Sequence, residues 1–128
     1  MSDFYGGEYI NEILTDDTAV AALVSTNIFN ARMVPSDFNS LKTINFYATL
    51  PKSARAEFFE SRWSVDCRSD VESESMNIAS AVTDALNRVS STVGSYNYFS
   101  VVDILGTIPP ADNADVYNTP VQVYIRRR

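Results

Sequence analysis

The side chains that most often carry catalysis are scarce in this sequence. It contains no histidine and a single cysteine, Cys67. Without histidine no Ser-His-Asp or Cys-His arrangement can form, and the commonest metal ligand is missing. Cys67 shares an alternating pattern with Trp63 and Val65, so we interpret it as a small core residue and not as a nucleophile. A lone cysteine also excludes an intrachain disulfide.

Carboxylates are the remaining groups that could support acid–base or metal chemistry. The acidic stretch 112–115 lacks the glycine and the closing glutamate of an EF-hand calcium loop. Asp16 and Asp17, like Glu72 and Glu74, fall at expected helix N-termini, where the helix dipole stabilises negative charge. No phosphate-binding or cofactor motif is present. We therefore expect no catalytic residue, no metal and no cofactor, and the protein is not expected to be an enzyme.

The elements that would position these residues begin with two short helices. Ile10, Ile13 and Leu14 form one apolar stripe at helical spacing, and the capping residues that follow predict a second helix over Thr18–Val24. Strands are then expected over Ile28–Met33, Thr43–Leu50 and Glu57–Arg68. In the last of these, apolar and polar residues alternate, as in a strand with one buried face.

After Arg68 the spacing of apolar residues changes to that of a helix, and after this helix it returns to the alternation of strands. A helix of roughly 20 residues is expected to follow Ser69, which has the capping-box spacing to Glu72, and Gly94 is expected to stop it. Its apolar stripe consists of Val71, Ile78, Ala79, Val82, Leu86 and Val89. Two more strand regions follow, Tyr96–Ile108 and Val116–Arg126. Pro120 is expected near the start of the last ladder or at an edge.

This order of elements predicts an α+β fold. We expect an antiparallel sheet of about four to five strands, with a long helix packed on one face and short N-terminal helices. The chain has 128 residues, which suits a single domain over residues 1–128. No signal peptide or membrane span is visible, so we expect a product made in the cytoplasm with no membrane partner.

The formal net charge of -6 argues against a protein that reads nucleic-acid sequence. The only concentrated positive charge is the run Arg126 to Arg128. This run is interpreted as a solvated chain end, with an electrostatic contact to an acidic neighbour as the alternative.

Aromatic residues are expected on both faces of the sheet. Tyr96 and Tyr98 share a face opposite Phe99, and the adjacent Phe58 and Phe59 must point to opposite sides of a regular strand. A domain with few helices covers only one sheet face well. The other face is therefore either simply exposed or covered by a partner subunit.

Three stretches of the sequence resemble the family of phage tail-completion proteins, which includes the tail terminators of long-tailed phages. The first is Ile13–Val24 followed by Asn27-Ile28-Phe29, and the second is Arg62–Cys67 running into the helix Ala79–Leu86. The third is Asp115-Val116-Tyr117 before the closing strand Val121–Ile125. The likeness covers nearly the whole chain in order and spacing.

The resemblance implies a structural virion protein that forms a ring, usually a hexamer, at the head-proximal end of the tail. Such a ring stops growth of the tail tube, touches the tube protein and the head connector, and lets DNA pass through its lumen without specific binding. An acidic subunit suits that passage, because like charge keeps the phosphate backbone from adhering. The alternatives are a head–tail joining protein of the neck, a transient assembly chaperone, and a small carboxylate enzyme.

Interfaces to other subunits are expected at two projections, the tip after Thr43–Leu50 and the loop Thr107–Val116, and at the C-terminus. Edge-to-edge pairing of strands around the ring is a further expectation. The residues expected at these interfaces are Leu50, Pro51, Lys52, Arg55, Phe58, Pro109, Pro110, Asp112, Asp115, Tyr117, Arg126, Arg127 and Arg128.

Overall fold

The computed structural model describes residues 6–32, 42–50, 61–104, 106–108 and 116–127. Its helices are α1 (Gly7–Asp16), α2 (Thr18–Val24) and α3 (Glu72–Leu86). Its strands are β1 (Ile28–Phe29), β2 (Thr43–Leu50), β3 (Ser61–Ser69), β4 (Val89–Val93), β5 (Tyr96–Ile104) and β6 (Tyr117–Arg127). The side chain of Leu50 is not described.

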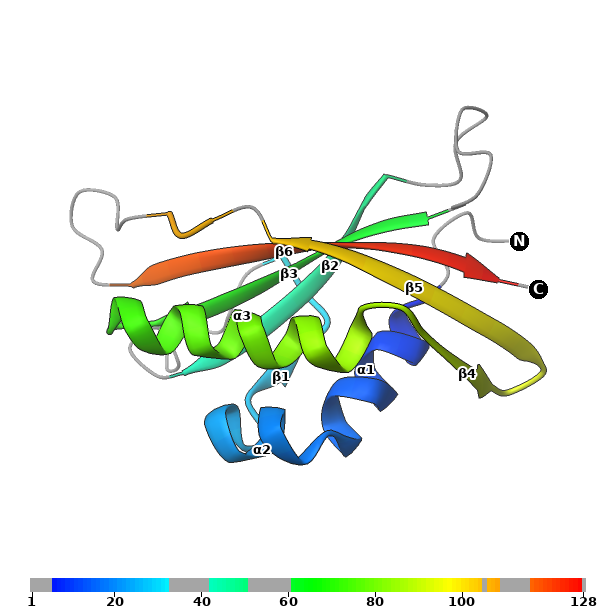
Figure 1. The fold of residues 1–128 in the computed structure, drawn as a ribbon, viewed down its shortest axis with the longest axis horizontal. Coiled ribbons are helices and arrows are strands. Elements are labelled where there is room, and N and C mark those ends of the chain that lie inside the picture. Colours follow the sequence, from blue (N-terminus) through cyan, green and yellow to red (C-terminus); the bar gives the residue numbers. More distant parts are fainter. Residues whose placement is uncertain (1–5, 33–41, 51–60, 105, 109–115, 128) are drawn as a thin grey trace.

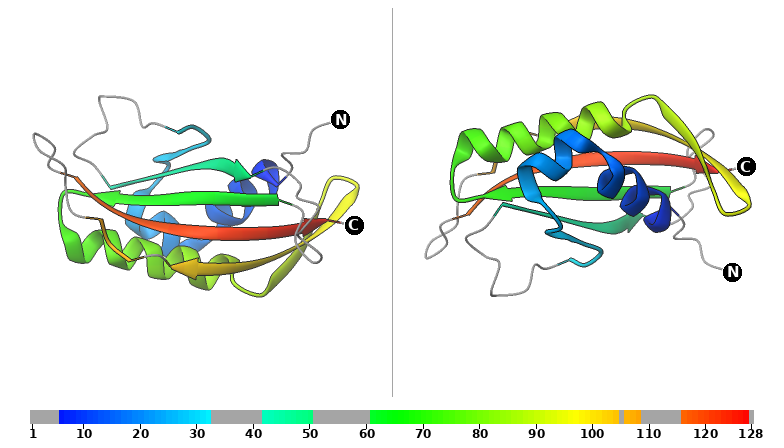
Figure 2. Two further views of the ribbon diagram at one scale, coloured as in Figure 1. Left: turned by 90° about the horizontal axis from the view of Figure 1, so that it is seen from above. Right: turned by 90° about the horizontal axis from the view of Figure 1, so that it is seen from below.

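The strands form one curled sheet in the order β1-β2-β3-β6-β5-β4. β1 pairs with β2 in parallel, and every other neighbouring pair is antiparallel. All three helices lie on one face of this sheet, and the β4–β5 hairpin bends toward the same side (Figure 1). α3 runs along the sheet, with α1 and α2 beside it (Figure 2).

The predicted α+β class is confirmed, and the sheet is larger than expected because Val89–Val93 forms a strand. The sheet is also mixed and not purely antiparallel as predicted, because β1 pairs with β2 in parallel. We had placed Val89 at the end of the long helix, and this was wrong. The helix ends at Leu86, and Arg88 adopts a left-handed φ of 57° that turns the chain back into β4. Val89 fits the spacing of a helix and of a strand. It lies three residues after Leu86, as on a helical stripe, and four residues before Val93, so the two valines also share one face of a strand.

The start of α3 also differs from the prediction. Val71 is the N-cap residue and is 45% exposed, so it does not belong to the buried stripe. Ser69 and Glu72 do not form a capping box. Instead, the Ser69 hydroxyl accepts a hydrogen bond from the Val71 N–H (3.1 Å) and donates one to Glu74 (3.1 Å). The remaining predicted stripe, from Ile78 to Leu86, is buried as expected.

Two strands are shorter than predicted. β1 ends at Phe29, because the side chain of Asn45 donates hydrogen bonds to the carbonyl oxygens of Ala31 and Arg32 (both 3.1 Å). These side-chain bonds take the place of a longer ladder. β5 ends at Ile104, and Ile108 forms only an isolated bridge to Asn118.

Gly94 does not stop the helix but forms the turn of the β4–β5 hairpin. The ladder closes at Val93 and Tyr96, which leaves a loop of two residues, and Gly94 has a φ of +61°. Two-residue hairpin loops favour glycine at a position of positive φ. Pro120 lies near the start of β6, as predicted. It is opposite Asp66 of β3 and directly precedes Val121, the first residue of β6 with a partner in β5.

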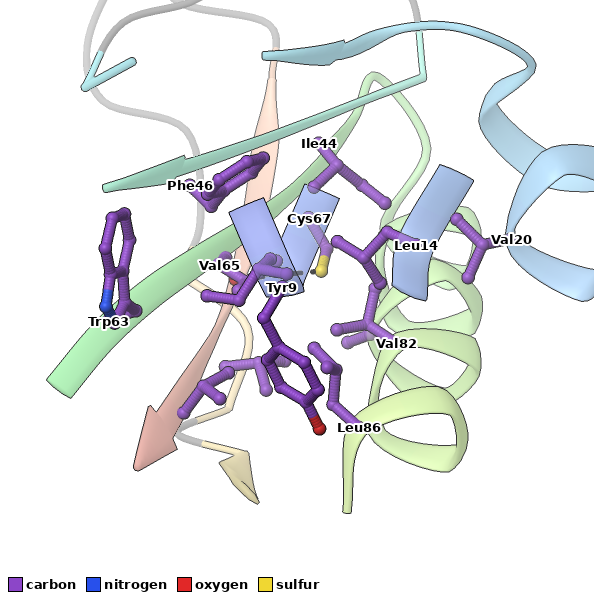
Figure 3. Packing of buried hydrophobic residues seen from close by; sticks show 14 of the residues in the cluster. Tyr9, Leu14, Val20, Ile44, Phe46, Trp63, Val65, Cys67, Val82 and Leu86 are labelled. Atoms are coloured by element: carbon purple, nitrogen blue, oxygen red, sulfur yellow. Dashed lines mark hydrogen bonds between the residues drawn. The ribbon is translucent and has the colours of Figure 1, made fainter. Parts of the chain in front are cut away.

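The hydrophobic core lies between the helices and the face of the sheet that they cover. Alternating residues of β2, β3 and β6 point into it, and residues of α1 and α3, among them Leu14, Val82 and Leu86, pack against them (Figure 3). Cys67 is fully buried in this core, as predicted, and burial raises the pKa of its thiol well above the usual value. The largest fully buried side chains include Tyr9, Phe46, Ile10 and Leu14.

A chain of hydroxyl groups joins α3 to the sheet inside this core. Ser75 Oγ lies 2.7 Å from the carbonyl oxygen of Cys67 and 2.8 Å from Thr119 Oγ1. A carbonyl only accepts, so Ser75 donates to Cys67 and Thr119 donates to Ser75. Thr107 Oγ1, 2.9 Å from Thr119 Oγ1, then donates to Thr119. These hydrogen bonds all run in one direction, and together they give partners to buried polar groups of α3, β3 and β6.

Candidate interaction surface

The face of the sheet opposite the helices carries a series of arginine–aromatic pairs. Arg62 of β3 stacks over the ring of Tyr124 of β6 at 5.0 Å, and the two residues are direct cross-strand partners. Arg126 of β6 lies 5.8 Å from the ring centre of its cross-strand partner Phe99. Guanidinium groups are held by the negative faces of aromatic rings. The cross-strand register of β3, β6 and β5 thus fixes both guanidinium positions.

A third pair extends this face to β2. Arg32, just after β1, lies 4.9 Å from the ring centre of Tyr47. The Tyr47 hydroxyl donates a hydrogen bond to the Asp66 carboxylate (3.2 Å), and the Ser64 hydroxyl donates a second one (3.1 Å). Burial raises the pKa of Tyr47, which keeps its hydroxyl protonated as a donor. We name this surface, with Arg32, Arg62, Arg68 and Arg126 as its cations, the arginine face.

Two of the three C-terminal arginines belong to the sheet. Arg126 and Arg127 form the last two residues of β6, are half-buried, and pair with Phe99 and Tyr98 of β5. The Arg127 guanidinium lies 4.0 Å from the ring centre of Tyr96. The interpretation as a solvated run is therefore wrong for these two residues, because the central strand of the sheet continues through them.

A hollow of about 490 Å³ lies at the β4–β5 end of the arginine face. Its lining includes Ser90, Thr92, Asn97, Phe99 and Arg126. The Thr92 hydroxyl is already bound to the side chain of Asn97 (2.6 Å). The lining offers hydroxyl, amide and guanidinium groups around an aromatic ring, which suits contact with a polar surface.

The aromatic residues occupy both faces of the sheet, as predicted. Tyr98 is buried on the helical side, stacked 5.1 Å from Tyr9, while Phe99 lies on the arginine face. Tyr96 meets Tyr98 edge to face at 6.5 Å and is 42% exposed.

Only part of the predicted interface falls on described residues. Tyr117 is the first residue of β6 and is half-buried, opposite Ser69 of β3. Leu50 is the last residue of β2, and its backbone pairs with Arg62. The residues that lie outside the described part of the chain are Pro51, Lys52, Arg55, Phe58, Pro109, Pro110, Asp112, Asp115 and Arg128.

The sequence-based interface did not include Arg32, Tyr47, Arg62 or Tyr124. The alternation of Arg62, Ser64, Asp66 and Arg68 had assigned them to one polar strand face, and this signal was correct. It did not show that β6 lies beside β3, so the pairing of arginines with aromatic rings stayed hidden. Ser64 and Asp66 are also buried, which a simple polar face does not predict.

Two of the four carboxylates predicted at helix N-termini, Asp17 and Glu74, have structural partners, whereas Asp16 is the last residue of α1 and so does not lie in the first turn of a helix. Asp17 is the N-cap of α2 and accepts a hydrogen bond from the Val20 N–H (3.0 Å). Glu72 and Glu74 lie in the first turn of α3, as predicted, and Glu74 forms an ion pair with Lys42 (2.9 Å). Within the described ranges, no group of three or more potential metal-ligating side chains comes together. No helix there is both long and apolar enough to cross a membrane.

Comparisons with known proteins give a match of fold to a solved structure, but no match of sequence family. No protein-family model matches the sequence, and no curated protein matches it. The fold is similar to that of a chain in a solved structure described as "Virion of native gene transfer agent (GTA) particle". The TM-score is 0.65 at 18% sequence identity, and the match covers 92% of this chain and 90% of that chain. The two chains therefore share a fold over nearly their whole lengths.

Proposed function

We propose that this protein is a structural, non-enzymatic subunit of a phage-like particle. In this proposal residues 1–128 form a single tail-terminator-like domain that assembles into a hexameric ring at the head-proximal end of the tail. The ring ends polymerisation of the tail tube and offers a surface to the head connector. DNA passes through its lumen without specific binding.

One observation carries the proposal, the match of fold over 92% of this chain to a chain of a virion. Neither chain has a large segment outside the shared fold, because the match also covers 90% of the other chain. The resemblance of three sequence stretches to tail-completion proteins supports the same conclusion from separate information. The net charge of -6 supports free passage of DNA, because negative charge does not retain phosphate groups.

The arginine face supports a role in assembly. Arginine and aromatic residues are enriched where proteins meet, and here they lie together on the sheet face that the helices leave free.

The decisive experiment places a nonsense mutation in this gene within a particle-producing genome, with the wild-type gene supplied in trans as the control. Electron microscopy of the lysate is expected to show over-long tail tubes without heads beside filled heads. Tails of normal length that fail to join heads would assign the protein to head–tail joining. Intact infectious particles would contradict the proposal.

A second measurement separates a ring subunit from an assembly chaperone. Mass spectrometry of purified particles is expected to detect the protein at a fixed ratio to the tail tube protein. Its absence from finished particles, together with defective assembly, would point to a chaperone.

A further inference from the structure

The charge of the molecule is divided between its two faces. The arginine face carries Arg32, Arg62, Arg68 and Arg126, against the hydrogen-bonded Asp66 and the exposed Asp103. The helices on the opposite face contain no lysine and no arginine. The carboxylates of these helices are Glu8, Glu12, Asp16, Glu72, Glu74 and Asp84.

We propose that the arginine face of one copy docks on the acidic helical layer of a second copy. The two surfaces are complementary in charge and lie on opposite sides of one molecule, so the contact is head-to-tail. Such heterologous contacts close into rings when the rotation between copies allows it. The inference rests on the proposed ring and specifies which surfaces meet in it.

Charge reversal on each face tests this contact. One variant carries Arg62→Glu and Arg126→Glu, and a second carries Glu12→Lys and Asp84→Lys. Each variant alone weakens the charge complementarity between the two faces, so its assembly is expected to weaken by about tenfold or more relative to wild type. In a mixture, an alternating ring keeps the native charges at every second contact, and at the other contacts it sets the introduced glutamates against the surface that carries the introduced lysines. Analytical ultracentrifugation and native mass spectrometry are expected to show rings in the mixture.

Controls separate folding from assembly. Arg88→Glu changes the same charge at an exposed residue between α3 and β4, away from the arginine face, and is expected to assemble as wild type does. Circular dichroism checks that each variant is folded. If Arg62→Glu fails to fold, the pair Arg62→Gln and Arg126→Gln takes its place and is expected to weaken assembly less than reversal. Unchanged assembly of that folded pair would contradict the contact.

Several results would overturn the inference without touching the proposed function. These are rings of either reversed variant at wild-type strength, or a mixture that does not recover. A wild-type protein that stays monomeric at high concentration would contradict both this contact and the proposed hexameric ring. If instead the wild type retains duplex DNA and Arg62→Glu loses it, the face belongs to nucleic acid. Tail length in the nonsense mutant judges the proposed function separately.

Discussion

At the residue scale, the start of α1 depends on two adjacent glycines. Gly6 has a φ of +112°, and a Cβ atom there would lie 2.7 Å from Cδ1 of the buried Ile125. A Cβ atom on Gly7 would lie 3.0 Å from Cη2 of Trp63. The absence of side chains lets the first turn of α1 rest directly on β3 and β6. We therefore assign Gly6 and Gly7 a role in close packing, since they are not part of a phosphate-binding motif.

We expect Gly6→Ala to destabilise the fold by about 1–3 kcal/mol, because it combines an unfavourable φ with crowding in a packed core. Chemical denaturation measures the change. Gly106→Ala is the matched control, since Gly106 has a φ of +95° but nothing within 4 Å of the added Cβ. Equal losses in the two variants would mean that close packing at Gly6 contributes nothing.

Tyr9 joins three elements through one hydroxyl group. Ser100 Oγ donates to the carbonyl oxygen of Leu86 (2.6 Å), so the Tyr9 hydroxyl is the donor in its 2.7 Å contact with Ser100 Oγ. The same proton also faces the carbonyl oxygen of Val89 at 3.2 Å. We expect Tyr9→Phe to lower the free energy of unfolding by about 1–2 kcal/mol, because buried polar groups lose a partner. Urea denaturation at neutral pH measures this loss.

The pH dependence gives a second check on Tyr9. Burial raises the pKa of Tyr9 above its ordinary value of 10.0 in the folded state. The stabilisation is fully present below pH 10.0 and is lost as the pH rises toward the folded pKa, since only the unfolded state ionises readily. The difference between wild type and Tyr9→Phe should therefore narrow above pH 10.0. A constant difference across this range would contradict the burial argument.

At the element scale, an ion pair fixes the start of α3 to the beginning of β2. Glu74 accepts from Lys42 (2.9 Å) and from the Ser69 hydroxyl (3.1 Å). The hydrogen bond from Lys42, helped by the one from Ser69, lowers the pKa of Glu74 below 4.5. The two contacts join the first turn of α3 to the residue before β2 and to the last residue of β3.

Glu74→Gln is expected to make the stability of the fold depend less on pH in the acidic range. Because the folded pKa is lowered, the stabilisation is present above about pH 4.5 and is lost as the pH falls through the folded pKa. The effect should be small, since both partners are partly exposed. Melting temperatures of the two proteins should therefore converge on acidification. Glu72→Gln, in the same helical turn, serves as the control.

Elements with a single clear period could be predicted, and those at a change of period could not. Thr18–Val24 and Thr43–Leu50 have the predicted bounds, because capping residues and β-branched runs act locally. The end of α3 was missed, because nothing local marks Arg88 as a residue of left-handed φ. The arginine face was missed for a different reason. Its pairs join β3, β6 and β5, and their register depends on contacts far apart in the sequence.

At the scale of the whole molecule, the last strand of the chain is a central strand of the sheet. β6 lies between β3 and β5, and α3 packs on it. Both halves of the sheet therefore depend on residues at the end of the chain. The sequence predicted a closing strand, but the strand order that places it in the middle is a property of the complete fold.

Deletion of residues 126–128 tests this dependence. The deletion removes the backbone pairs of Phe99 with Arg126 and of Tyr98 with Arg127, together with two cation–π contacts worth about 0.5–1 kcal/mol each. We expect a clear fall in the midpoint of urea denaturation. The double variant Arg126→Gln, Arg127→Gln keeps the strand. It should therefore lose only the share of the stability that comes from the guanidinium groups. A truncated protein as stable as wild type would mean that these arginines behave as a solvated tail, and that β6 ends before them in solution.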